Sequence, residues 1–331
     1  MDDRDRPGAT IRNERIVEDS RRTNPRTRLR RLWHALGGVK SLPFWGVHVA
    51  AVAGVALTGW SWTGLALALA LYFGRMFFVC AGYHRYFAHR SFTAGRAVQL
   101  ALAVGATLSL QKGVLWWAAN HRLHHRYSDG PRDVHSPVQR GFWWSHLGWI
   151  LADDHAETPW AMIPDFARYP ELRWLNRHYL IPPIALAAVL VLAGGWWALL
   201  WGFFASTTLL WHGTFIVNSL SHLVGRRRYA TRDASRNNLA IALVTMGESW
   251  HNNHHRYAAA ARQGFFWWEV DATYYVLWLM ARLGLIRDLR PPPRHVLDEG
   301  RVNEGRVNEG RVNEGRPADV RAPSAVASNA A

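Results

Sequence analysis

Two pairs of long apolar stretches constrain the fold of this chain more than any other feature. The first pair covers residues 42–60 and 62–80, and the second covers 180–201 and 203 to about 222. Each stretch has roughly the 20 residues that a helix needs to cross a bilayer. The links inside each pair carry no charge, whereas arginines flank the outer ends, and basic loops favour the cytoplasmic side. We therefore predict an all-α integral membrane protein with four transmembrane helices in two hairpins and both termini in the cytoplasm.

Three histidine clusters follow or flank these stretches. Residues 121–125 and 251–255 both have the pattern H-x-x-H-H. Positions i, i+3 and i+4 share one face of a helix, so each motif is predicted to aim three imidazoles at one spot. His84 and His89 form the third cluster, and five residues turn about 140° on an α-helix. These two rings therefore share a target only if their helix ends or bends between them.

The clusters predict a metal site on the cytoplasmic face, because the four-span topology places all three on that side. For the same reason residues 97–110 are expected to form an interfacial helix. The single cysteine, Cys80, excludes a disulfide framework and a cysteine-based zinc or iron–sulfur site. Eight imidazoles are too many for one tetrahedral zinc and fit two metal ions, but imidazole alone does not choose between iron, zinc and copper. The candidate ligands are His84, His89, His121, His124, His125, His251, His254 and His255.

Composition divides the chain into three regions. Residues 1–40 are polar and arginine-rich and predict a disordered basic cytoplasmic arm, 41–290 a membrane domain with a cytosolic helical cap, and 291–331 a disordered tail. The tail repeats Glu-Gly-Arg-Val-Asn, a five-residue period that fits neither helix nor strand. The net charge of +15 suits anionic lipid, a phosphate-bearing substrate or an acidic partner. Nucleic acid is excluded, because no recognition module is present.

Five segments resemble the membrane-bound fatty acyl desaturases, specifically the acyl-CoA (stearoyl-CoA type) Δ9 branch. They lie in the family's order and spacing, and the resemblance covers roughly residues 40–290. The segments are 82–92 (GYHRYFAHRSF), 120–128 (NHRLHHRYS), 140–149 (RGFWWSHLGW), 218–222 (NSLSH) and 247–255 (GESWHNNHH). The sequence departs from the animal enzymes at Asn120, Phe215 and Trp250, which leaves chain length and double-bond position open.

The resemblance implies an oxidoreductase with a di-iron centre that uses O2 and two external electrons. Its reaction would insert a cis double bond, at Δ9, into a saturated acyl-CoA, with acyl carrier protein or a lipid acyl chain as other substrate forms. The resemblance also makes His222 a ninth ligand and Asn218 the holder of a metal-bound water. It implies no catalytic residue beyond the metal ligands.

The electron donor is expected to be a separate protein such as a ferredoxin, a rubredoxin or a flavin reductase, because the chain has no haem segment of the His-Pro-Gly-Gly type. The expected location is a bacterial inner membrane, with the active site facing the cytoplasm. A lipid hydroxylase of the same histidine-cluster superfamily is the main alternative. A metal transporter or sensor is disfavoured, because such proteins place ionisable residues deep in their spans.

Other polar residues receive plainer interpretations. Asp129, Asp133 and Glu248 are possible acceptors that orient the metal-binding rings, although each is first interpreted as an ordinary loop residue. His135 and His146 are predicted to be structural, and His48 and His212 to be satisfied polar groups within helices.

Overall fold

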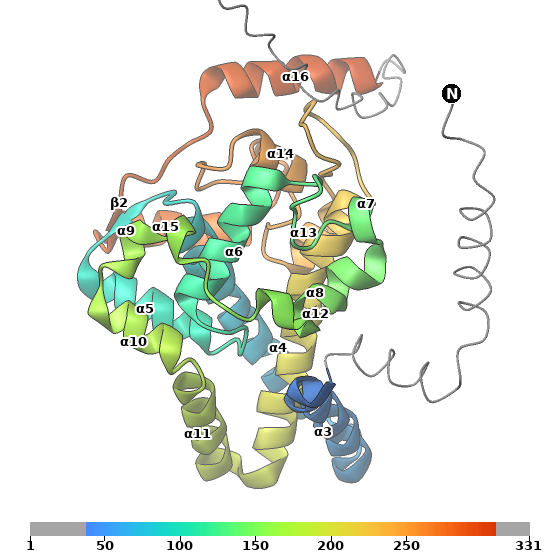
Figure 1. Ribbon diagram of the computed structural model, residues 1–331, viewed down its shortest axis with the longest axis vertical. Coiled ribbons are helices and arrows are strands. Elements are labelled where there is room, and N and C mark those ends of the chain that lie inside the picture. The colour runs from blue at the N-terminus through green and yellow to red at the C-terminus, as the bar shows by residue number, and fades with distance from the viewer. Residues whose placement is uncertain (1–37, 309–331) are drawn as a thin grey trace, which may run out of the picture.

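The computed structural model describes residues 38–308, and residues 1–37 and 309–331 lie outside the described part of the chain. The predicted basic arm over 1–40 therefore falls almost entirely outside it. The described part is mostly helical, with one short antiparallel pairing of β1 (Thr93–Ala94) and β2 (Ile286–Arg287). Apolar helices form one end of the molecule, and shorter helices form a cap at the other (Figure 1).

Within residues 38–308, three helices are long and apolar enough to cross a membrane: Gly38–Thr58, Trp62–Ala88 and Ile181–His222. The first combines η1 (Gly38–Ser41) and α3 (Leu42–Thr58), and the second combines α4 (Trp62–Phe78) and the π-helix η2 (Val79–Ala88). The third contains α11 (Ile181–Ala198), the π-helix η6 (Leu199–Ala205), α12 (Ser206–Ser219) and η7 (Leu220–His222).

The third helix is broken within α11. Gly195 has a φ of +61°, a left-handed conformation that glycine adopts without steric cost, and the chain reverses there (Figure 1). The sequence predicted this turn near residue 202, so the predicted boundary is wrong. Residues 181–193 make about 20 Å of helix, less than the roughly 30 Å of a bilayer core. The membrane character is clear, while four complete spans stay a prediction.

Local signals account for the first hairpin. Gly59, with a φ of +71°, follows the end of α3, and Ser61 caps α4 by accepting a hydrogen bond from the Gly64 amide at 3.0 Å. A Cβ on Gly64 would lie 2.4 Å from the ring of Trp201 in η6. Glycine at this position therefore lets the two hairpins pack closely.

The cap is built around η2, in which all ten residues are buried. Its main core cluster includes Tyr83, Phe87, Leu115, Leu172 and Leu277. The surrounding elements are α5 (Arg96–Thr107), α6 (Val114–Tyr127), α7 (Pro137–Arg140), η3 (Trp144–Gly148), α8 (Trp149–Leu151), η4 (Asp153–His155), η5 (Trp160–Met162), α9 (Pro164–Ala167), α10 (Pro170–Arg177), α13 (Leu239–Val244), α14 (His251–Arg256) and α15 (Ala272–Arg282).

The beginning of the repeat tail is helical, contrary to the disorder predicted over 291–331. Helix α16 (Arg294–Asn308) crosses the end of the cap that is farthest from the apolar helices (Figure 1). Its Val296 is fully buried in a cluster with Tyr229 and Phe266. Glu299 forms a salt bridge with Arg256 at 2.6 Å. The cap thus supplies the buried contacts that the repeat cannot make alone, which is why sequence period was a poor guide here.

Candidate metal centre

The π-helix η2 resolves the awkward spacing of His84 and His89. In a π-helix the amide of one residue bonds to the carbonyl five positions earlier, and the His89 amide donates to the His84 carbonyl at 3.1 Å. Residues five apart therefore lie nearly above one another, and the two rings meet with centroids 4.7 Å apart. The helix changes to the π period at Val79 and ends at Ala88, so it ends between the two histidines as the shared target requires.

Nine histidines come together in two adjacent groups. The first histidine group comprises His84, His89, His121, His125 and His254, and the second comprises His124, His222, His251 and His255. In α6 and α14 alike, positions i and i+4 of the H-x-x-H-H motif join one group and i+3 joins the other. The prediction that each motif aims all three rings at one spot is therefore wrong. On a helix i+3 and i+4 lie about 100° apart, so a motif placed between two sites contributes to both.

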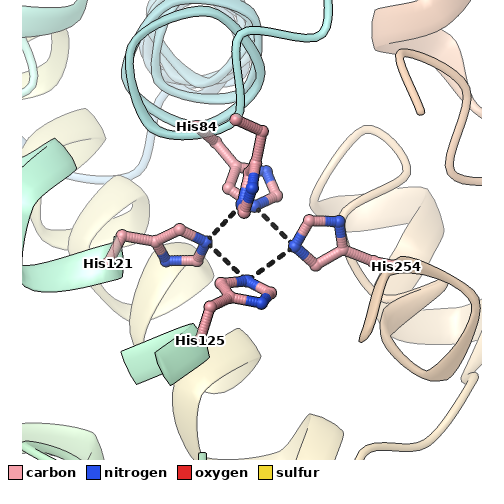
Figure 2. A group of neighbouring side chains, drawn as sticks. His84, His121, His125 and His254 are labelled. Carbon is pink, nitrogen blue, oxygen red and sulfur yellow. Dashed lines mark hydrogen bonds between the residues drawn. The ribbon is translucent and has the colours of Figure 1, made fainter. Parts of the chain in front are cut away.

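The Nε2 atoms within each group face one another. In the first group the Nε2–Nε2 distances are 2.8 Å for His89–His121, 3.0 Å for His121–His125, 2.9 Å for His125–His254 and 3.1 Å for His84–His254. Figure 2 shows four of these rings pointing toward a common centre. In the second group His251 lies 3.0 Å from both His222 and His255.

These distances fit nitrogens that share one ion. Two ligands about 2.1 Å from a metal lie about 3.0 Å apart at right angles, and about 3.4 Å apart in a tetrahedron. The observed spacing favours the right-angled arrangement, and five rings in the first group exceed the four ligands of a tetrahedral site. A tetrahedral zinc is therefore a poor match for the donor set.

Carboxylates on the far side of the rings determine which nitrogen is free. The Nδ1 atoms of His124, His222 and His255 donate to Asp133, Asp129 and Asp233 at 3.0, 2.8 and 2.7 Å. The Nδ1 of His84 contacts Glu248. A ring that donates from Nδ1 keeps its lone pair on Nε2 when neutral. The Nε2 lone pairs therefore converge. Because lone pairs repel one another unless a cation lies between them, this arrangement suits a metal ion.

Electrostatics supports these protonation states. Burial opposes ionisation of Asp129, but hydrogen bonds from His222 and Ser136 outweigh it and hold the pKa of Asp129 at about 2. Burial likewise opposes ionisation of Glu248, but its contacts with the His84 and Arg85 side chains hold its pKa at about 2. Burial lowers the pKa of His121 and His125 well below the usual range, so both stay neutral at pH 7.

Three of these carboxylates lie closer to the metal centre than their sequence context indicates. The sequence favours an ordinary loop role for Asp129, Asp133 and Glu248, yet each contacts a candidate ligand ring. Asp129 and Asp133 follow the first H-x-x-H-H motif in the next loop, a signal that could have been weighted more. No sequence signal points to Asp233, because it lies far from both motifs in the sequence.

The remaining polar candidates lie around the two groups. Asn218 lines a cavity together with His121. His135 stacks on His124 with ring centroids 4.2 Å apart. His212 bridges His48 and His146, at nitrogen distances of 3.1 and 2.9 Å. His48 and His212 are hydrogen-bonded as predicted.

The cavity that contains Asn218 has a volume of about 340 Å³ and largely apolar walls. It extends from His121 to Pro43 and Leu180, near the starts of α3 and α11. The Trp117 ring on its wall stacks against His121 with centroids 5.1 Å apart. Gln111 Nε2 donates to Thr214 Oγ1 at 3.0 Å, so these polar groups on the wall partner each other. The cavity can hold a long apolar chain beside the first histidine group.

Apolar helices of spanning length, two adjacent histidine groups and an apolar cavity beside the first group define a class, the histidine-cluster membrane proteins. The sequence profile described as fatty acid desaturase matches residues 60–285. The chain belongs to the fatty acid desaturase family, and it is an oxidoreductase that desaturates acyl chains.

Named relatives cover most of the chain. An sn-2 palmitoyl-lipid 9-desaturase of Nostoc sp. is 40% identical over 76% of this chain and 89% of its own length. An sn-1 stearoyl-lipid 9-desaturase of Anabaena variabilis is 36% identical over 76% and 93% of the two chains. An acyl-CoA 5-desaturase of Anemone leveillei is 33% identical over 79% and 82%.

Removing a carboxylate behind a ring tests whether the ring is a ligand. Asp133→Asn keeps the side-chain shape but weakens the hold on His124 Nδ1, whose distances to both Asp133 oxygens are 3.0 Å. We expect metal affinity to fall about 10- to 100-fold, measured by competition with a chelator. Asp298→Asn, on the exposed face of α16, is the control and should bind metal like the wild type. Equal affinity in both variants would remove Asp133 from the site.

Proposed function

We propose that this protein inserts a cis double bond at the Δ9 position of a saturated acyl chain by using two iron ions, O2 and two external electrons. The observation that carries the proposal is the convergence of nine histidines in two adjacent groups, the first of which meets the apolar cavity at His121. The balanced reaction takes two hydrogens from neighbouring methylenes, two electrons and two protons, and reduces O2 to two waters. When bound, the metal ions would supply the oxidant that removes hydrogen from an unactivated chain.

The first histidine group, with His84, His89, His121, His125 and His254, would hold one ion, and the second, with His124, His222, His251 and His255, would hold the other. Asn218 would orient a metal-bound water from the cavity wall. Asp129, Asp133, Asp233 and Glu248 would keep the ring nitrogens correctly protonated and oriented. The cavity would hold the chain, exclude water and determine which carbons face the ions.

The substrate form is proposed from the position of the cavity. Pro43 and Leu180 on its wall belong to the first turns of apolar helices, so a chain could enter from the membrane boundary. The Nostoc and Anabaena relatives are named for acyl-lipid substrates. Both points favour an acyl chain of a membrane lipid over the acyl-CoA first expected. The proposed setting is a bacterial inner membrane, crossed by four spans with both termini in the cytoplasm.

The fatty acids of cells that express this chain test the function. We expect new cis monoenes with the double bond at carbon 9, located by gas chromatography and mass spectrometry. A Val47→Trp variant should make at least about tenfold less product, because Val47 is 8% exposed and lines the cavity, and overfilling closes such a space.

Val49→Trp is the matched control, since Val49 points away from the core with 67% exposure, and it should retain activity and metal content. Hydroxylated chains in place of monoenes would assign the protein to the hydroxylase alternative. Purified enzyme given either a phospholipid or an acyl-CoA decides the substrate form. Conversion of only the CoA thioester would contradict the lipid proposal.

A further inference from the structure

A surface depression of about 770 Å³ reaches the metal centre from the side opposite the apolar helices. Its lining includes residues from the C-terminal ends of α6 and α14 and Glu299 of α16, and α16 crosses the end of the cap that is farthest from the apolar helices (Figure 1). His125 of the first histidine group and His255 of the second both line it. Their rings stack with centroids 4.5 Å apart. A molecule seated in the depression would therefore be within contact of both groups.

The depression and the acyl cavity share no lining residue. The cavity meets the first histidine group at His121, whereas the depression meets it at His125. The acyl chain and an occupant of the depression can therefore be present together. This separation argues against the depression as the place for a group attached to the acyl chain.

The exposed charge on the rim of the depression is positive. Arg126, Arg132 and Arg232 line the depression and are exposed. The acidic residues of the lining have partners within the protein: Asp129 accepts from His222, Asp233 accepts from His255, and Glu299 pairs with Arg256. The rim therefore attracts acidic partners and steers them toward the two histidines.

We propose that the three arginines around this depression dock an acidic, water-soluble one-electron carrier protein. The inference rests on the proposed function, which requires two external electrons. The depression faces away from the apolar helices, so its occupant comes from the water phase. Each docked carrier gives up one electron through the His125 and His255 edge and leaves oxidised. Two such visits provide the two electrons of the balanced reaction, and the protons come from solvent.

Binding of a reduced plant-type [2Fe–2S] ferredoxin to the full-length protein in lipid nanodiscs tests the proposal. Arg132→Glu/Arg232→Glu should raise the Kd at least about tenfold at low ionic strength. The difference should shrink at about 0.5 M salt, where screening acts within a few ångströms. Arg287→Glu/Arg301→Glu makes the same charge change at exposed positions outside the depression, and its Kd should stay within about twofold of the wild-type value.

A second measurement separates docking from chemistry. Turnover driven by a small reductant, dithionite with methyl viologen, should be equal in the docking variant and the wild type, while ferredoxin-driven turnover falls. If the Arg132→Glu/Arg232→Glu variant loses metal, Arg132→Gln/Arg232→Gln replaces it and should show an intermediate rise in Kd.

Unchanged ferredoxin binding by the docking variant would overturn the docking surface. Loss of CoA binding or of binding to anionic vesicles, with ferredoxin binding intact, would overturn the identity of the partner. A wild type that makes no product with either reductant would instead reject the proposed function.

Discussion

His254→Ala is expected to abolish the unsaturated product, with a loss of at least about a hundredfold, and to lower the metal content from two ions per chain toward one. His254 is 1% exposed and lies between two other candidate ligands, with its Nε2 3.1 Å from that of His84 and 2.9 Å from that of His125. Alanine removes a donor that no neighbouring side chain replaces, and an incomplete ligand set cannot place an ion for chemistry.

Elemental analysis of the purified protein and the fatty acid profile of expressing cells measure the two effects of His254→Ala together. His178→Ala is the control, because His178 is an exposed residue after α10 and lies outside both histidine groups. The control should keep both metal and product. Full product formation by the His254 variant would show that the first histidine group is not the reaction centre.

Arg85→Leu is expected to lower the apparent melting temperature by roughly 10 °C or more, from a loss of about 3–5 kcal/mol. Arg85 is fully buried in η2. Its Nη2 donates to Glu248 at 3.0 Å and to Asp271 at 2.9 Å, and its Nη1 donates to the Ala261 carbonyl at 2.7 Å. Leucine would leave two buried carboxylates without their cation, and one of them also contacts His84.

Arg96→Leu provides the contrast for Arg85, since it removes a pair with similar hydrogen bonds in a different environment. Arg96 donates to Glu171 at 2.8 and 2.9 Å, but its side chain is 66% exposed. Exposed pairs contribute about 0–1 kcal/mol, so its melting temperature should change by less than about 3 °C. Tryptophan fluorescence at one fixed heating rate in detergent compares the two variants. Equal shifts in melting temperature for the two variants would mean that the burial of Arg85 does not determine how much its loss destabilises the protein.

Much of the site could be predicted from the sequence because its ligands are repeated local motifs. Two H-x-x-H-H patterns and the His84–His89 pair identified eight histidines, and the resemblance added His222 and Asn218. The apolar stretches predicted the membrane character, which the three spanning-length helices bear out. These features depend on residue type and short-range spacing, and both are present in the sequence whatever the fold.

Other features could not be predicted, because they depend on contacts between distant segments. Asp233 lies 22 positions before the His255 ring that it holds. Helix α16 contacts the cap through Val296, which is buried in a cluster with Tyr229, and through the Glu299–Arg256 salt bridge. The chain reverses at Gly195, where φ is +61°, although the apolar pattern continues through it to residue 201 without marking a turn.

By itself the sequence determined that this is a helical membrane protein with histidine clusters of the desaturase type. Only the tertiary structure decided how the nine histidines divide into groups of five and four. It also decided that η2 adopts the π period that aligns His84 with His89. The physical reason is that a helix determines which side chains share a face, whereas the packing of η2, α6 and α14 determines what each face meets. A ligand's partners are therefore a property of the assembled helices and not of any one motif.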